Sequence, residues 1–207
     1  MKALLHPAYF PNIATFAVLA NHDTVWEIHD NFQKQTYRNR SYICTDQGLH
    51  MLTIPIKHVG GKDGRQKYSD VTVDNSYPWQ KQHWRTLQTA YRTSPFFEFF
   101  EDDLVFLFEK KVNFLLDFNL LTIETVGNCL GINPTKEKTT HFELSPTAYI
   151  DRRRLVIAKQ KTSVKLKAYT QVFGDRHGFI ENASILDLLF NEGPNTLDYL
   201  KNISMDH

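Results

Sequence analysis

The first strand and the turn after it, Ala3-Leu4-Leu5-His6-Pro7-Ala8-Tyr9-Phe10-Pro11-Asn12, predict how the rest of the chain is arranged. Three apolar residues begin the stretch, and two prolines then fix the backbone of the turn. Asn12 is of the residue type that caps helices, so a helix is expected over Ile13–Asn21. Residues 24–28 read as a second strand, and this strand–helix–strand spacing is typical of a parallel βαβ unit.

Three side chains of this turn, His6, Tyr9 and Phe10, are candidate site residues. They are expected at the carboxyl end of a strand, where ligands bind in open α/β sheets. The polar segment 30–40 leaves the second strand at the same edge and is expected to be a functional loop. The alternative is that His6 is a partly buried structural histidine and that the two aromatic residues belong to the core.

The composition predicts an ordinary globular protein. The chain has 207 residues, of which 42% are hydrophobic, and 24 Lys+Arg against 23 Asp+Glu. This balance gives no field that would attract nucleic acid or an anionic membrane surface. The apolar stretch before His6 is too short for a signal peptide, and no stretch is long enough for a membrane span. We therefore expect a cytoplasmic protein whose two cysteines, Cys44 and Cys129, are reduced.

The expected fold class is α/β, with a Rossmann-like strand–turn–helix start, a β-hairpin and a helical middle section. Runs 41–44 and 49–56 flank Thr45-Asp46-Gln47-Gly48, which is a hairpin signature. Residues 68–73 alternate like another strand. The segment 58–67 before them has three glycines and is basic, so it is expected to be a mobile flap.

Helical spacing dominates residues 76–131, which are expected to form a helical segment within a single domain covering residues 1–207. The helices expected in this segment cover residues 78–92, a stretch that begins at Ser94, and residues 120–130 with Asn119 as the cap. The last third gives weaker patterns. They predict short strands over 139–142, 155–158 and 169–173, and a helix over 185–190 with Ser184 as the cap.

His83 and the residues before the hairpin are further candidates. His83 follows Trp79 by four residues, so both share a helix face, and such a histidine can act as a general acid or base. Arg40 offers a planar fork to a carboxylate or phosphate, and its neighbours Arg38 and Asn39 add donors. The alternatives are a structural histidine and a solvated arginine paired with a carboxylate. The histidines and cysteines lack metal-ligand spacing, so no metal site is expected.

The chain also carries a series of short motifs. They are His6-Pro7-Ala8-Tyr9-Phe10-Pro11, Asn39-Arg40-Ser41, Thr53-Ile54-Pro55-Ile56, Trp79 with His83-Trp84, Ala90-Tyr91, Ser94-Pro95-Phe96-Phe97-Glu98, Lys111, Tyr169-x-Gln171-x-Phe173 and Ser184-Ile185-Leu186-Asp187-Leu188-Leu189-Phe190-Asn191. In this order they resemble the WbqC-like protein family over nearly the whole chain. The resemblance implies a role in bacterial cell-surface polysaccharide and O-antigen biosynthesis, but no particular reaction or cofactor. Trp84 and Gln171 belong to these motifs and are taken as further substrate-binding candidates.

A fainter likeness is to adenylyl-transferring enzymes whose strand–turn–helix junction carries a His-x-Gly-His turn. In that arrangement the helix N-terminus binds nucleotide phosphates. Here the turn has one histidine and no glycine, and residues 159–163 are only loosely similar to the mobile lysine–serine loop of such enzymes. This likeness rests on the fold rather than on a matching site.

The expected function is that of an enzyme that transfers a group onto a small activated or anionic substrate, such as a nucleotide-linked amino sugar, in surface-glycan biosynthesis. The assigned roles are acid or base for His6 and His83, binding of an anionic group for Asn39 and Arg40, pocket walls for Tyr9, Phe10 and Trp84, and substrate binding for Gln171. The alternative is a non-catalytic binding or assembly protein of a glycan pathway that uses the aromatic stretch 95–100 as its contact surface.

Overall fold

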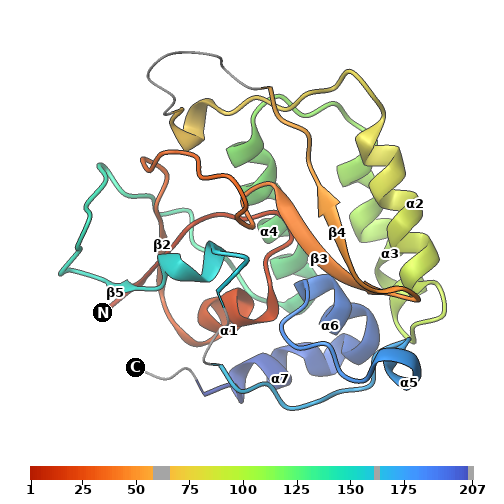
Figure 1. Ribbon diagram of the computed structural model, residues 1–207. Helices are drawn as coiled ribbons and strands as arrows, with labels where there is room; N and C mark the ends of the chain where they lie inside the picture. The colour runs from red at the N-terminus through yellow and green to blue at the C-terminus, as the bar shows by residue number, and fades with distance from the viewer. Residues whose placement is uncertain (58–65, 161–163, 205–207) are drawn as a thin grey trace.

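The computed structural model describes residues 1–57, 66–160 and 164–204. These residues form a parallel sheet and an antiparallel hairpin, with helices packed around both (Figure 1). The elements are β1 (Ala3–Leu5), α1 (Ile13–Asn21), β2 (Thr24–Trp26), β3 (Arg40–Thr45), β4 (Gly48–Thr53), η1 (Tyr68–Asp70), α2 (Trp79–Tyr91), α3 (Phe97–Val105), η2 (Phe106–Phe108), α4 (Leu115–Leu130), β5 (Ile150–Asp151), η3 (Arg153–Val156), α5 (Gly174–His177), α6 (Ile185–Glu192), η4 (Gly193–Asn195) and α7 (Thr196–Lys201). The expected α/β class is confirmed.

The parallel sheet has the strand order β2-β1-β5. Ala3 of β1 is in register with Thr24 on one side and with Ile150 on the other. The βαβ unit expected from the first 28 residues is therefore present, and its strands are buried throughout β1 and β2. A third parallel strand from residue 150 was not expected from the sequence.

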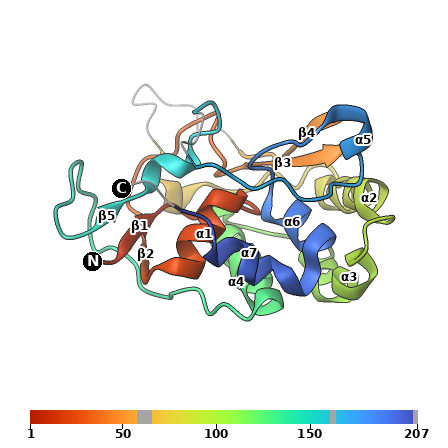
Figure 2. The same ribbon diagram turned by 90° about the horizontal axis from the view of Figure 1, so that it is seen from below.

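Helix α1 is apolar on all sides because it is covered on all sides. Seven of its residues, Ile13 to Leu19, are buried. Helices α6 and α7, from the far end of the chain, pack against it (Figure 2). Asn12 caps its first turn by accepting from the backbone N–H of Thr15 at 3.0 Å, as the sequence predicted.

The hairpin β3–β4 is also confirmed, with Thr45 opposite Gly48 and a two-residue loop between them. Gly48 has φ +91°, a conformation that a glycine adopts without strain. The second strand ends at Thr53 rather than at residue 56. Ile56 instead forms a single bridge with Val73, so pairing continues there with another segment.

Helix α4 begins five residues earlier than expected, at Leu115. Asn119 does not cap it but lies inside it, fully buried. Its amide donates to the backbone carbonyl of Arg38, 81 positions earlier in the chain, at 2.6 Å. The asparagine is therefore present because of a partner far away in the sequence, and a capping rule that considers only neighbouring residues does not predict this bond.

Four of the expected strands after the hairpin are wrong or shortened. Residues 68–70 and 153–156 form 3-10 turns, and residues 139–142 and 169–173 form no strand. Only single bridges remain near them, such as Thr72 with Phe114 and Thr36 with Ile157. Most of the flap expected at 58–67 lies outside the described residues. The helix after Ser184 is confirmed and extends to Glu192.

Two glycines with positive φ provide a test of the packing. Gly193 has φ +52° and lies against the ring of Phe96, so a Cβ added there would overlap the ring. Gly131 has φ +68°, and a Cβ added there would point into open space. We expect Gly131→Ala to lower the free energy of unfolding by about 1 kcal/mol through backbone strain alone. Gly193→Ala should cost about 1–3 kcal/mol more because the ring must move. Chemical denaturation of both variants measures the difference, and equal costs would contradict this packing.

Candidate functional site

The residues that follow the three parallel strands meet at one edge of the sheet. His6 comes directly after β1, Asp30 comes shortly after β2, and Arg153 comes shortly after β5. Strand β1 lies between the other two, so the order of the strands reverses beside it. Ligands of α/β proteins bind outside the carboxyl ends of the strands at such a reversal. This edge is the candidate site.

His6, Asp30 and Arg38 form what we call the switch-point cluster. Nδ1 of His6 lies 3.2 Å from the carbonyl oxygen of Glu27, and Nε2 lies 3.3 Å from Oδ2 of Asp30. The carbonyl of Glu27 and the carboxylate of Asp30 both only accept, so they compete for the single N–H of the neutral ring. With that N–H on Nδ1, Nε2 and the carboxylate face each other as two acceptors. A proton bound between them converts this repulsion into a hydrogen bond.

The charges of the cluster follow from burial and from the ion pair. Nη2 of Arg38 donates to Oδ2 of Asp30 at 2.8 Å. Burial lowers the pKa of His6, and the nearby Arg38 lowers it further, although Asp30 partly opposes them. Burial would raise the pKa of Asp30, but the contacts with His6 and Arg38 outweigh it and lower this pKa. At neutral pH the cluster therefore holds a carboxylate, a guanidinium and a neutral imidazole.

The segment that carries Arg38 is fixed between the turn after β1 and η3, the 3-10 helix that follows β5. The backbone carbonyl of Tyr37 accepts from the N–H of Tyr9 at 3.0 Å, and the N–H of Tyr37 donates to the carbonyl of Val156 at 2.8 Å. The guanidinium carbon of Arg38 lies 5.4 Å from the centre of the Tyr68 ring. These contacts hold Arg38 without any solvent exposure.

Arg153, the second buried cation at this edge, has acceptors for its guanidinium. It donates to both carboxylate oxygens of Asp151, at 2.9 and 2.6 Å, and to the carbonyls of Glu143 and Leu144, at 2.7 and 3.0 Å. Burial would raise the pKa of Asp151, but the contacts with Arg153 lower it. Arg153 therefore fastens the chain before β5 to the sheet edge.

The turn between β1 and α1 contains a strained residue. Phe10 has φ +38°, which is rare for a bulky side chain. Its carbonyl accepts from the hydroxyls of Ser41 and Ser184, at 3.0 and 3.1 Å. Two distant elements, the hairpin and α6, thus hold the strained turn in place. Such strain is concentrated at functional sites.

The N-terminus of α1 does not offer its N–H groups to a phosphate. The N–H of Ile13 donates to the carbonyl of Ala183 at 3.1 Å, and that of Ala14 donates to Oδ1 of Asn182 at 2.9 Å. Asn12 takes the N–H of Thr15. The segment before α6 therefore occupies the position where nucleotide phosphates bind in the adenylyl-transferring enzymes mentioned above.

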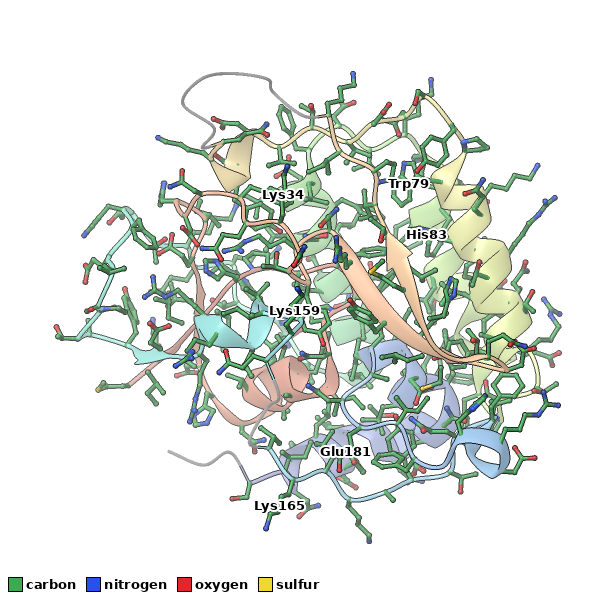
Figure 3. The ribbon with its side chains drawn as sticks, viewed as in Figure 1. Lys34, Trp79, His83, Lys159, Lys165 and Glu181 are labelled. Atoms are coloured by element: carbon green, nitrogen blue, oxygen red, sulfur yellow. The ribbon has the colours of Figure 1, made fainter. Side chains whose placement is uncertain are left out.

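The structure separates His83 from the switch-point cluster. Nδ1 of His83 lies 3.0 Å from the hydroxyl of Tyr9, and its ring packs edge-on against Trp79. In the view of Figure 3, Trp79 and His83 lie on α2 beside the hairpin, whereas Lys34 and Lys159 lie on its other side. Tyr9 joins the two regions, since it belongs to the same turn as His6.

Tyr9, Phe10, Asn39 and Arg40 lie in the core or at the start of the hairpin. Tyr9 and Phe10 are in the core, with at most 1% of their surface exposed. The side chain of Asn39 donates to the carbonyl of Ile54 at 3.0 Å, and Arg40 is half-buried at the start of β3. Their roles in binding remain predictions.

Trp84 and Gln171 lie away from the sheet edge. Trp84 lines a cavity of about 620 Å³ beside Tyr77 and Lys111. Gln171 is buried, and it donates to Oδ2 of Asp187 at 2.7 Å and to the carbonyl of Ile180 at 3.0 Å. Among the described residues, neither Trp84 nor Gln171 has a hydrogen bond, ion pair or ring contact with the switch-point cluster.

A second buried network surrounds Asp187 of α6. The hydroxyls of Tyr91 and Tyr169 donate to its carboxylate, as does the amide of Gln171. Burial raises the pKa of Asp187 despite these donors. The network fastens the segment before α6 to α2, so the motif residues of this region have a positioning role in this structure.

The aromatic stretch 95–100 forms no continuous exposed patch. Phe97 and Phe100 are buried, with 0% and 4% of their surface exposed, and Phe96 packs over Gly193. Phe99 is 71% exposed. The contact surface required by the binding-protein alternative is thereby reduced to the one exposed ring of Phe99.

Sequence reasoning underrated Asp30 and Arg38. Both lie in the segment expected to be a functional loop, but the sequence gives Arg38 only as a donor beside Arg40 and assigns no role to Asp30. The signal for Asp30 was its position soon after β2, which places a carboxylate at the same sheet edge as His6. Which of two arginines is buried depends on the packing of Tyr68 and Asn119, which are far away in the sequence.

The fold and site define an α/β protein with a charged cluster at the reversal point of a short parallel sheet. Residues 6–165 match the model of the WbqC-like protein family. The chain belongs to this family, as its motifs indicated. It is also similar to Uncharacterized protein Rv1507c of Mycobacterium tuberculosis, with 28% identity over 235 aligned positions that cover 96% of each chain. No solved structure matches. No helix among the described residues could cross a bilayer.

His83 gives a prediction about pH. Burial lowers its pKa to about 4, although a hydrogen bond to the Thr53 backbone partly opposes this. The unfolded chain, with an ordinary histidine pKa near 6.5, then binds a proton between pH 6.5 and 4 that the folded chain does not. Stability is therefore fully present above about pH 6.5 and is lost as the pH falls, by roughly 3 kcal/mol for this residue.

We expect His83→Gln to remove this part of the pH dependence, because glutamine binds no proton. Urea denaturation at pH 7 and pH 4 would measure it, with His141→Gln as the matched control. His141 is an exposed histidine whose side chain is 69% accessible. If the wild type and His83→Gln lose equal stability on acidification, His83 is not held neutral.

Proposed function

We propose that this protein is an enzyme that transfers a group to or from a small anionic substrate. The observation that carries this proposal is the switch-point cluster: a carboxylate, an imidazole and a buried guanidinium at the edge where α/β proteins bind ligands. Group transfer needs a proton acceptor and a fixed positive charge close together. The cluster supplies both within a few ångströms.

The proton acceptor is the pair formed by His6 and Asp30. When a hydroxyl or amine of the acceptor substrate attacks an activated donor, it loses a proton as the new bond forms and the donor's leaving group departs. That proton fits between Nε2 of His6 and Oδ2 of Asp30, which are 3.3 Å apart. The side chain of Asp30 is 11% exposed against 4% for His6, so Asp30 is the member that faces the substrate. His6 orients it and shares the proton.

The family suggests the pathway in which this chemistry takes place. The motifs of the chain are those of the WbqC-like family, which points to bacterial surface-polysaccharide and O-antigen biosynthesis. Substrates there are small, polar and often carry phosphate or carboxylate groups. A nucleotide-linked amino sugar is a suitable example. We place the reaction in the cytoplasm, where such activated precursors are made.

The first test is a search for the substrate. We expect a nucleotide sugar or another activated anion to raise the melting temperature of the full chain. A ligand at 100 times its dissociation constant adds about 2.7 kcal/mol, which for a chain of this size corresponds to a shift of about 5–10 °C. A thermal-shift screen of nucleotides, nucleotide sugars, amino acids and acyl carriers would measure it. A flat response across all four classes would count against an enzyme of small substrates.

The second test separates binding from chemistry. With the ligand from the screen, His6→Gln should keep most of the affinity and lose at least about a hundredfold in turnover, the usual contribution of a general base. Isothermal calorimetry and product analysis give the two quantities. His22→Gln, at the opposite end of the strands, is the matched control. Unchanged turnover in His6→Gln would exclude the pair as the proton acceptor.

A further inference from the structure

Arg38 is a buried cation with unused donors. Its side chain has no exposed surface, and neither Nε nor Nη1 has a hydrogen-bond partner among the residues that the structure describes. Its pairing with Asp30 uses Nη2 alone. Three N–H bonds, one on Nε and two on Nη1, are therefore without an acceptor.

Such a state is unfavourable, because a buried donor that lacks its partner costs about 1–3 kcal/mol, and more when it is charged. Burial lowers the pKa of Arg38, although Tyr68 and Asp30 oppose this, and a guanidinium remains charged at any physiological pH. The protein thus holds a cation in a position where its charge is only partly compensated.

The surroundings keep this guanidinium rigid. The ring of Tyr68 lies under it, the hydroxyl of Tyr68 donates to the carbonyl of Pro7 at 2.9 Å, and Asn119 fixes the backbone of Arg38 from α4. Each of these residues is completely buried or nearly so. A receptor that is held in place before its ligand arrives loses little entropy on binding.

Asn119 adds a second unpaired group beside Tyr68. Its Nδ2 donates to the carbonyl of Arg38 and to the hydroxyl of Tyr68, which fixes the orientation of the amide. Its Oδ1 is buried and accepts no hydrogen bond from any described residue. Within the described part of the chain, the same small region therefore contains three free donors and one free acceptor.

We propose that Arg38 is the receptor for the anionic group of the substrate, and that a carboxylate or phosphate oxygen accepts from its Nε and Nη1. This rests on the proposed function for the rest of the substrate, but the oxyanion itself follows from the unpaired donors. Two other places at this edge are already occupied, since the first N–H groups of α1 donate to residues 182–183 and Arg153 has its acceptors. Because Arg38 is fully covered, residues around it must move aside to admit the anion.

The test uses the full chain and two simple probes, inorganic phosphate and acetate, titrated at constant ionic strength adjusted with chloride. In the wild type, one or both should raise the melting temperature. Arg38→Lys keeps the charge beside Asp30 but lacks the free Nε and Nη1 donors, so its apparent affinity should fall by at least about tenfold. Arg85→Lys, the same change at an exposed arginine of α2, is the matched control and should respond like the wild type.

A second measurement needs no variant to fold. The ¹⁵N–¹H signal of the Arg38 Nε group in the wild type should shift downfield on addition of the bound anion, because this N–H gains an acceptor. The phosphate and acetate arms show which oxyanion is recognised. A response in neither arm would mean that water satisfies these donors, and the proposal would be wrong.

Two further results would also overturn it. Loss of the response in Arg40→Lys with retention in Arg38→Lys would assign the anion to Arg40, as the sequence alone suggested. A wild-type shift of the melting temperature without any change at the Arg38 Nε signal would place the anion elsewhere. Anion binding at Arg38 without turnover of any donor would refute the enzyme and leave the receptor intact.

Discussion

The ion pair between Arg38 and Asp30 is the interaction on which this sheet edge depends. It joins the loop after β2 to the residues that lead into β3, and its carboxylate also faces His6 after β1. Breaking a buried pair by removing one partner typically destabilises a protein by about 3–5 kcal/mol, because the other charge stays buried. Two elements far apart in the sequence, η1 and α4, supply the residues that enclose Arg38. The charge thus determines where several elements must lie.

The strained turn at Phe10 is a second constraint, and residues that follow it in the chain hold it in place. Ser41 and Ser184 both donate to its carbonyl, so the hairpin and α6 converge on one backbone group. The buried network around Asp187 then fixes the segment that leads to Ser184. The C-terminal third therefore contributes little secondary structure to the sheet but holds the turn that carries His6. This explains why its apolar and polar residues gave weak strand patterns.

Local signals in the sequence were sufficient for the parts of the fold that local contacts decide. Asn12 and Ser184 cap helices through bonds to residues two or three positions away, and the hairpin follows from its own turn residues. The start of α4 was misplaced because Asn119 serves Arg38 rather than a helix end. The position of His6 at a strand end was local information. Its pairing with Asp30, and the choice of Arg38 over Arg40 for burial, depend on packing that no neighbouring residue reveals.

The closed N-terminus of α1 changes how this α/β start can be used. In the familiar nucleotide-binding folds, the first helix attracts the phosphate through its free N–H groups and its dipole. Here Asn182 and Ala183 take those groups, so the shared fold does not carry the shared mode of binding. Positive charge at this edge comes from side chains instead, and Arg38 is provided by the loop between β2 and β3. Under the proposal that Arg38 receives the anion, recognition depends on that loop, while the sheet and α1 hold it.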